Sequence, residues 1–427
     1  RSAMSLTLNL RQNVTFHDGT TLDAEAVKVN LDRAITLPES QRKADVSQIK
    51  NVVVKDPNTV VIELTAPAVP LLAALTDRIG FILSPKAIAE NGLNVGRNPV
   101  CTGPYKFVER VAQDRVVVER FPGYWDKDKY FLDRITFRII VDASVRLANL
   151  QSGDIDILER LEPGDLKRLQ SDPKLRVVKI DTGGYFSMVV NTSTTEPAGK
   201  TILGQDARAR EALDWAIDRK AINDVVYDGQ FIVGNQPAPP GSPLYNPKFP
   251  VQGRDVEKAK KILRDAGYTQ PVPMEIWLGN QPTTIRAAEI IQAMANEAGF
   301  DTKLRVLEFT AEIAAATRGE FHVRGPIGLR GSKDPDQLTI TALHSKGGTN
   351  QGRYNNPEMD RVLDAGKSET DPAKRALIYQ EAAAINARDR AVIYILHPVQ
   401  IFVHTTRLTG YTPNPDGFFH FDGVKLN

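Results

Sequence analysis

The sequence has 427 residues, of which 41% are hydrophobic and 25% are charged, as is ordinary for a globular protein. One hydrophobic core stops growing at about 250–300 residues, so two or three lobes are expected. The 54 Lys and Arg residues are interspersed with 52 Asp and Glu residues and leave a formal charge of +2. This pattern excludes the clustered basic face of a nucleic-acid-binding protein.

The first half of the sequence predicts a lobe rich in antiparallel hairpins. Residues 5–10 alternate as a strand does, and Asp23 is a plausible cap for a helix that extends to about residue 35. Residues 52–64 predict two strands around an Asp-Pro-Asn turn. A second hairpin is predicted over residues 105–120.

The pattern changes at Asp206, where helices begin to alternate with strands. Apolar residues at helical spacing predict one helix over residues 207–222, and a proline-dense loop follows. The later elements predicted are helices ending near 267 and 298, strands at 274–278 and 303–307, helices at 357–365 and 372–388, and strands at 392–396 and 401–404. This alternation predicts an α/β lobe with a mainly parallel sheet.

The sequence lacks the common motifs of catalytic, nucleotide-binding and metal-binding sites. No phosphate loop, dinucleotide fingerprint, nucleophile elbow or HExxH motif occurs, and the six histidines are scattered. Ser-x-x-Lys occurs at 47–50 and 171–174 without companion motifs, and the lone Cys101 is interpreted as inert. We therefore expect no catalytic residue, no cofactor and no bound metal. A triad assembled in space is compatible with one sequence, so a peptide or ester hydrolase stays a rival hypothesis.

Seven short sequence blocks, between residues 16 and 360, occur together in the chain. Taken together they resemble the signature blocks of the dipeptide/oligopeptide-binding proteins, which are solute-binding protein family 5 of the ABC transporters. The blocks are FHDGTTLDAEAV at 16–27, TGPY at 102–105, ERFPGYW at 119–125, LQSGDID at 150–156, ARAREALDWAIDRK at 207–220, residues 255–268, and YNNPEMD at 354–360.

The resemblance implies a periplasmic-binding-protein-like α/β fold, with two lobes around a ligand cleft and an extra small domain. It places a small α+β domain at 1–95, the first visible part of a discontinuous domain at 96–192, the α/β lobe at 193–398, and the return to the discontinuous domain at 399–427. The implied partners are a small-molecule or peptide ligand and an ABC permease in the membrane. A periplasmic, or extracellular and membrane-anchored, monomer is expected.

The start of the chain departs from the family pattern. The family has further residues before the Phe16 block, including some ligand contacts, and this sequence opens at Arg1 without a signal peptide. Either the chain was processed or its beginning is missing, so those ligand contacts cannot be named.

The ligand strand of the family should correspond to residues 328–336, which read GLRGSKDPD. In peptide-binding relatives this stretch pairs with the ligand as an added strand, and an aspartate holds the terminal ammonium of the peptide. Depending on where one gap is placed, that position falls here on Ser332 or Gly331, and neither is acidic. The predicted contact residues are Gly328, Leu329, Arg330, Gly331, Ser332 and Lys333.

The charge of this segment suggests the kind of ligand. If Arg330 or Lys333 faces the cleft, an anionic or neutral ligand is favoured over one with a free α-amino group. Lys333 is equally well interpreted as a solvated loop charge.

Three further residues are weaker candidates for ligand contact. Asn280 follows a predicted strand and precedes a helix, where α/β lobes bind ligands. His397 lies between the last two strands and either lines the pocket or is an ordinary buried histidine. Tyr185 is a candidate for the hinge or the pocket.

The expected mechanism is closure of two lobes around a solute that is released unchanged. A ligand-sensing adaptor that signals without transport is the alternative that the sequence does not separate from import.

Overall fold

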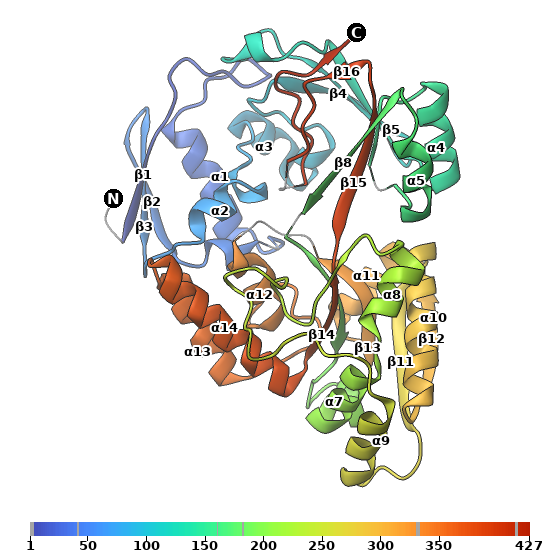
Figure 1. The fold of residues 1–427 in the computed structure, drawn as a ribbon. Helices are drawn as coiled ribbons and strands as arrows, with labels where there is room; N and C mark the ends of the chain where they lie inside the picture. The colour runs from blue at the N-terminus through green and yellow to red at the C-terminus, as the bar shows by residue number, and fades with distance from the viewer. Residues whose placement is uncertain (1–3, 41, 160, 182, 330–333, 415–416) are drawn as a thin grey trace. The chain divides into compact units, whose positions relative to one another are not determined.

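The computed structural model describes residues 4–40, 42–159, 161–181, 183–329, 334–414 and 417–427. The chain divides into two compact units (Figure 1). Unit 1 contains residues 1–180 and 400–427, and unit 2 contains residues 181–399. The small domain expected at 1–95 and the segment expected at 96–192 thus fall together in unit 1, apart from residues 181–192. Unit 2 corresponds to the expected α/β lobe, with a beginning twelve residues earlier, and the chain passes between the units twice.

Unit 1 is built from small antiparallel sheets and short helices. Its main sheets have the orders β1-β3-β2, β4-β5-β6 and β7-β15-β8. The strands are β1 Ser5–Asn9, β2 Ile49–Asp56, β3 Thr59–Leu64, β4 Tyr105–Val111, β5 Arg115–Arg120, β6 Arg134–Arg138, β7 Ile157–Glu159, β8 Leu175–Asp181, β15 Val399–Thr405, β16 Leu408–Thr409 and β17 Lys425–Leu426. The helices are α1 Ala24–Thr36, α2 Leu71–Leu75, α3 Pro85–Asn91, α4 Ala143–Ser152 and α5 Leu166–Gln170. The two hairpins predicted from the sequence are confirmed as β2–β3 and β4–β5.

Unit 2 is an α/β lobe around one six-stranded sheet. Its strands are β9 Tyr185–Val190, β10 Ile232–Val233, β11 Val272–Gly279, β12 Phe300–Leu307, β13 Val323–Leu329 and β14 Val392–His397. Its helices are α6 Ile202–Gln205, α7 Ala207–Ala216, α8 Arg219–Tyr227, α9 Val256–Asp265, α10 Pro282–Glu297, α11 Phe309–Arg318, α12 Pro335–Leu343, α13 Pro357–Ser368 and α14 Pro372–Asp389.

The sheet of unit 2 is mixed, so the expectation of a mainly parallel sheet was wrong. Its order is β10-β14-β9-β13-β11-β12. β11 is parallel to β12 and β13, whereas β9 is antiparallel to β13 and β14, and β10 is antiparallel to β14. The reason is the connection to unit 1: β9 carries the chain away from one crossing and β14 brings it back to the other, so the two neighbours run in opposite directions.

Helices cover both faces of this sheet because its strands are apolar on both sides. Successive residues of a strand point to opposite faces. Accordingly Ile393 and Ile395 belong to the core under α7 to α10, while Val392 and Tyr394 belong to the core under α12 to α14. A strand buried on both faces reads as a continuous apolar run, which explains the wholly buried β14.

One predicted helix is in fact two. Residues 207–222 were expected to form a single helix, but α7 ends at Ala216 and α8 begins at Arg219. The carboxylate of Asp218 accepts a hydrogen bond from the amide of Ala221 at 2.9 Å and so caps a new helix. An Asp side chain that bonds to the local backbone competes with helix continuation, which the apolar spacing alone does not reveal.

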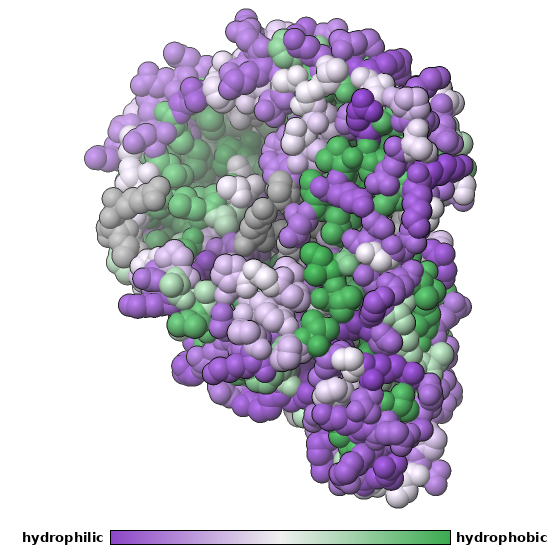
Figure 2. All heavy atoms as spheres, viewed as in Figure 1, coloured by the Kyte–Doolittle hydropathy of each residue, from purple (hydrophilic) through white to green (hydrophobic). Residues whose placement is uncertain are grey.

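The outer helix α9 shows the amphipathic pattern plainly. Ala259 and Leu263 are buried against α7, while hydrophilic side chains cover the visible face of this part of unit 2 (Figure 2). The carboxylate of Asp255 caps the helix, as predicted from the sequence.

Candidate functional site

The strand register brings several predicted ligand-site positions to one edge of the sheet in unit 2. Tyr185 at the start of β9 lies opposite Leu329 at the end of β13, and Phe186 lies opposite Leu396 near the end of β14. β11 is parallel to β13, so the loop after Gly279 leaves the sheet at the same edge. Open α/β sheets bind their ligands at the carboxyl ends of their parallel strands. We call this edge the β13 edge.

Gly328, near the end of β13, is exposed to solvent. A Cβ placed on Gly328 would lie 3.2 Å from the ring of Phe186, its neighbour across the strands, so even alanine requires that ring to shift. Leu329 ends the strand. The remaining predicted contact residues lie outside the described residues; they are Arg330, Gly331, Ser332 and Lys333.

The predicted extended segment stops earlier than residue 336. Asp334 caps α12, with its carboxylate accepting from the amide of Asp336 at 2.9 Å, and Pro335 takes the first helical position. The expectation of an extended backbone through residue 336 was therefore wrong. An Asp-Pro pair is a common helix start, and this signal in the sequence could have placed the boundary.

Both carboxylates at the start of α12 are bonded to α14. The guanidinium of Arg375 donates to the two oxygens of Asp334 at 2.8 Å each, and the hydroxyl of Tyr379 donates to Asp336 at 2.9 Å. Desolvation raises the pKa of Asp336 to about 7, against the opposing attraction of Lys367 and the Tyr379 hydrogen bond. These two acidic groups therefore already have partners within unit 2.

Tyr185 is wholly buried, with 0% of its surface exposed. Its hydroxyl donates to the carbonyl of Leu338 in α12 at 3.1 Å. Its ring meets the ring of Tyr394 edge-on, with centroids 4.7 Å apart. The side chain thus joins the start of β9 to α12, from inside the core.

His397 is also buried, with 1% exposed, and lies two residues before the second crossing between the units. Its Nδ1 is 3.1 Å from the carbonyl oxygen of Gly184, so we assign the proton to Nδ1 as the donor. Desolvation lowers the pKa of the imidazole, which favours the neutral form. Its Nε2 packs so closely on Gly234 that a Cβ there would lie 2.3 Å away.

Asn280 is exposed in the turn between β11 and α10. Gly279, just before it, packs under the side chain of Gln281, whose Oε1 would lie 2.5 Å from an added Cβ. Among the predicted residues that the structure describes, Asn280 therefore has a side chain exposed to solvent at this edge.

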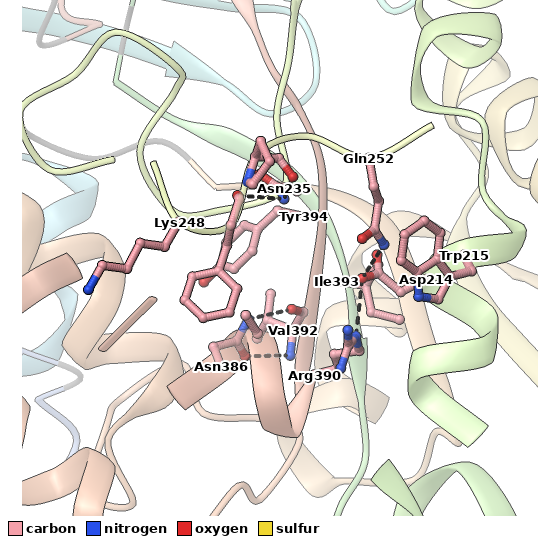
Figure 3. A pocket seen from close by; sticks show the side chains of 13 residues that line it. Asp214, Trp215, Asn235, Lys248, Gln252, Asn386, Arg390, Val392, Ile393 and Tyr394 are labelled. Carbon is pink, nitrogen blue, oxygen red and sulfur yellow. Dashed lines mark hydrogen bonds and ion pairs between the residues drawn. The ribbon is translucent and has the colours of Figure 1, made fainter. Parts of the chain in front are cut away.

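A pocket of about 270 Å³ lies elsewhere in unit 2, and no residue of the predicted site lines it (Figure 3). It is bounded by α7, the loop at 235–252, the end of α14 and the start of β14. The carboxylate of Asp214 accepts from Gln252 at 3.0 Å and from Arg390 at 3.2 Å, and it forms an ion pair with buried Arg219. The charged groups Asp214 and Arg390 in the pocket thus pair with each other, and we assign the pocket no ligand.

The lone cysteine is not activated as a nucleophile. Burial raises the pKa of the Cys101 thiol to about 11, which disfavours the nucleophilic thiolate. Among the described residues, no group of three or more His, Cys, Asp and Glu side chains is arranged to hold a metal ion. None of the described helices has both the length and the apolar character that crossing a membrane requires.

Comparison with known proteins gives a consistent result over the chain. The sequence profile of the bacterial extracellular solute-binding proteins, family 5 Middle, matches residues 2–350. The glutathione-binding protein GsiB of Pectobacterium atrosepticum is 29% identical over 436 aligned residues, which cover 99% of this chain and 83% of the relative.

Solved structures show the same fold. The periplasmic binding protein DppA of Helicobacter pylori, in complex with the peptide STSA, is 24% identical with a TM-score of 0.87, covering 99% of this chain and 86% of that one. AgaA from A. tumefaciens R10, in complex with agropinic acid, is 23% identical with a TM-score of 0.85, covering 100% and 87%. The predicted periplasmic-binding-protein-like α/β fold is confirmed.

Proposed function

We propose a ligand for this chain from the premise that the chain belongs to the bacterial extracellular solute-binding proteins of family 5. The ligand is a peptide-like or other small organic solute, and no carboxylate of the protein pairs with a free α-ammonium group of the ligand. Proteins of this family are the substrate-binding components of ABC importers; they bind peptides or small solutes and are not enzymes. They work outside the cytoplasm, in the periplasm or extracellular space, with a membrane permease.

The observation that carries the proposal is that the described carboxylates at the start of α12, Asp334 and Asp336, already have partners in α14. The four residues after Leu329 are Arg, Gly, Ser and Lys, and the acidic residues that follow are held by Arg375 and Tyr379 of α14. A buried ammonium without an opposite charge costs several kcal/mol. A ligand that had to bury a free amine at this point would therefore bind weakly.

The charge of the segment favours a ligand that is anionic or neutral. Arg330 and Lys333 contribute two cationic side chains within four residues. The names of two compared proteins agree with an acidic ligand, since one is named for glutathione and the other was solved with agropinic acid. Glutathione, a peptide with two carboxylates, is the first ligand to try.

The proposed contacts lie at the β13 edge. The main chain of Gly328 to Lys333 would pair with the ligand in an extended conformation, which supplies affinity that does not depend on ligand side chains. The exposed amide of Asn280 would add a polar contact. We place His397 and Tyr185 behind this surface as buried supports, because their exposed fractions are 1% and 0%.

The proposed mechanism is closure about the two chain crossings, at residues 180/181 and 399/400. A ligand that gains contacts from both units only in the closed form shifts an existing equilibrium toward that form. The permease would then recognise the closed form and receive the solute unchanged.

The experiment is a ligand panel measured by native mass spectrometry and thermal shift on the purified chain. The panel is glutathione and the dipeptide Met-Leu, each also in its N-acetylated form. We expect binding at a ratio of one to one, release of unaltered ligand, and similar stabilisation by the free and acetylated forms. Stabilisation that requires the free amine, or hydrolysis of the ligand, contradicts the proposal. Loss of uptake when the gene is deleted separates import from sensing alone.

A further inference from the structure

A side-chain hydrogen bond connects the two places at which the chain enters and leaves unit 2. His397 ends β14, close to the last residue of unit 2, and Gly184 precedes β9, close to the first. The Nδ1 of His397 donates to the carbonyl oxygen of Gly184 at 3.1 Å. In the described register, the last pair of β9 and β14 is Phe186 and Leu396. The bond therefore joins the two strands beyond their ladder, and we call it the His397 link.

The link suits a neutral imidazole only. Because Nδ1 carries the proton, Nε2 of the neutral ring has no hydrogen. This Nε2 is buried and has no hydrogen-bond partner among the described residues. It packs on Gly234, where an added Cβ would lie 2.3 Å away. Protonation would place a positive charge and an N–H at this position without an acceptor, which is strongly unfavourable in a buried site.

The charged surroundings of the ring do not offset this cost. Desolvation lowers the pKa of His397, although the hydrogen bond to Gly184 and the negative charge of Asp181 both act to raise it. The strands packed around the ring bring two titratable groups, Tyr185 and Tyr394, and burial raises the pKa of both phenols, so they stay neutral in acid. These strands, β9, β10 and β14, lie in stretches without another charged residue, at 183–190, 231–235 and 391–400.

We propose that His397 is a proton-sensitive connection between the two ends of unit 2: the neutral ring holds Gly184 to the end of β14, and protonation of the ring opens the link. The inference does not rest on the identity of the ligand, because His397, Gly184 and Gly234 all belong to unit 2. The proposed closure takes place about the same two chain crossings, so the order of these strand ends would depend on pH.

The direction of the pH dependence follows from proton binding. With the link open the ring is solvated and protonates near pH 6.5, whereas in the closed link its pKa is lower. The open form therefore binds more protons in acid, so the link is complete above about pH 6.5 and weakens as the pH falls below that value. Removing the negative charge of Asp181 lowers the pKa in the closed link further, and it should make the weakening in acid larger.

The test is hydrogen exchange of backbone amides in the purified chain at pH 7.5 and pH 5, without ligand, with each rate divided by the intrinsic rate at that pH. In the unaltered chain we expect the protection of residues 184–187 and 395–397 to fall at least about threefold between pH 7.5 and pH 5, relative to that of β11 and β12.

Three variants separate the proton from other effects of acid. His397→Asn keeps an N–H donor near the position of Nδ1 and does not ionise, so it should show no such fall. His322→Asn removes a partly exposed histidine elsewhere in unit 2 and should behave as the unaltered chain does. Asp181→Asn should show a larger fall than the unaltered chain. Each protein is compared with itself at two pH values, so a general loss of stability does not imitate the result.

Three results would overturn the inference. They are constant protection in the unaltered chain between the two pH values, an equal fall in His397→Asn, and a fall in Asp181→Asn that is no larger than in the unaltered chain. If His397→Asn does not fold, Asp181→Asn and the unaltered chain decide the matter. Failure of the chain to bind any compound of the ligand panel overturns the proposed function and leaves this inference standing, since the exchange is measured without ligand.

Discussion

Replacing Asp336 with asparagine should change how the stability of unit 2 depends on pH. Desolvation raises the pKa of this carboxyl from 3.8 to about 7 in the folded chain. Between those pH values the folded chain holds a proton that the unfolded chain has lost, so the free energy of unfolding falls as the pH rises. At 1.36 kcal/mol per pKa unit, the shift lowers the free energy of unfolding by about 4 kcal/mol in full. Water that reaches the partly exposed carboxylate makes this decrease smaller, so we expect a decrease of about 2–4 kcal/mol. Asparagine keeps an acceptor for Tyr379 and never ionises.

The assay is urea unfolding of the unaltered chain and of Asp336→Asn at pH 4.5, 6, 7 and 8. Two of the three tryptophans, Trp215 and Trp277, lie in unit 2, so Trp125→Phe is introduced into each protein and the remaining fluorescence reports on unit 2. The two proteins should be closest in stability at pH 4.5, the variant should become increasingly the more stable as the pH rises toward 7, and the difference should change little between pH 7 and 8. Asp301→Asn, which alters an exposed carboxylate on β12, is the matched control and should show no such divergence. A difference between variant and unaltered chain that is the same at every pH would refute the reasoning.

Three further predictions concern the rest of the molecule. Gly234→Ala should cost about 1–3 kcal/mol of stability, because the new Cβ would lie 2.3 Å from His397, whereas Gly253→Ala, with nothing within 4 Å, should cost almost nothing in the same thermal unfolding assay. Asp214→Asn should cost about 3–5 kcal/mol in urea unfolding, since it leaves a buried guanidinium without its opposite charge; a loss under 1 kcal/mol would show that the charge is solvated. Cys101 should react with iodoacetamide at pH 8 about 100-fold more slowly than an ordinary thiol, because burial raises its pKa to about 11, and rapid labelling would show that the site opens.

The sequence predicts elements well where one local rule governs them. The alternation around residues 255–307 predicts α9, β11, α10 and β12, with ends shifted by a few residues. The break between α7 and α8 was missed because apolar spacing continues across it, although Asp218 carries the cap signal. The antiparallel pairing of β9 with its neighbours was missed because the direction of β9 and β14 depends on the two crossings between the units. No local sequence pattern encodes these crossings.

The candidate site was predictable only in part. The family resemblance predicted an extended ligand segment at 328–336, whereas β13 ends at Leu329 and α12 begins at Pro335, and ligand contact by this segment stays a prediction. The strand register brings Tyr185 beside Leu329. The bond from Arg375 to Asp334 spans 41 residues of sequence, and an Arg on the face of a helix gives no sign of its partner. The burial of His397 likewise depends on Gly184 and on a glycine in a different loop, which meet only in the folded chain.

Isothermal titration of Met-Leu against N-acetyl-Met-Leu, and of glutathione against its N-acetylated form, tests the central claim most directly. If the solute is bound at the β13 edge without a carboxylate for its amine, at least one pair should bind, with dissociation constants for the two members within about threefold of each other. A loss of 100-fold or more on acetylation, about 3 kcal/mol, would show that an acidic group grips the amine after all.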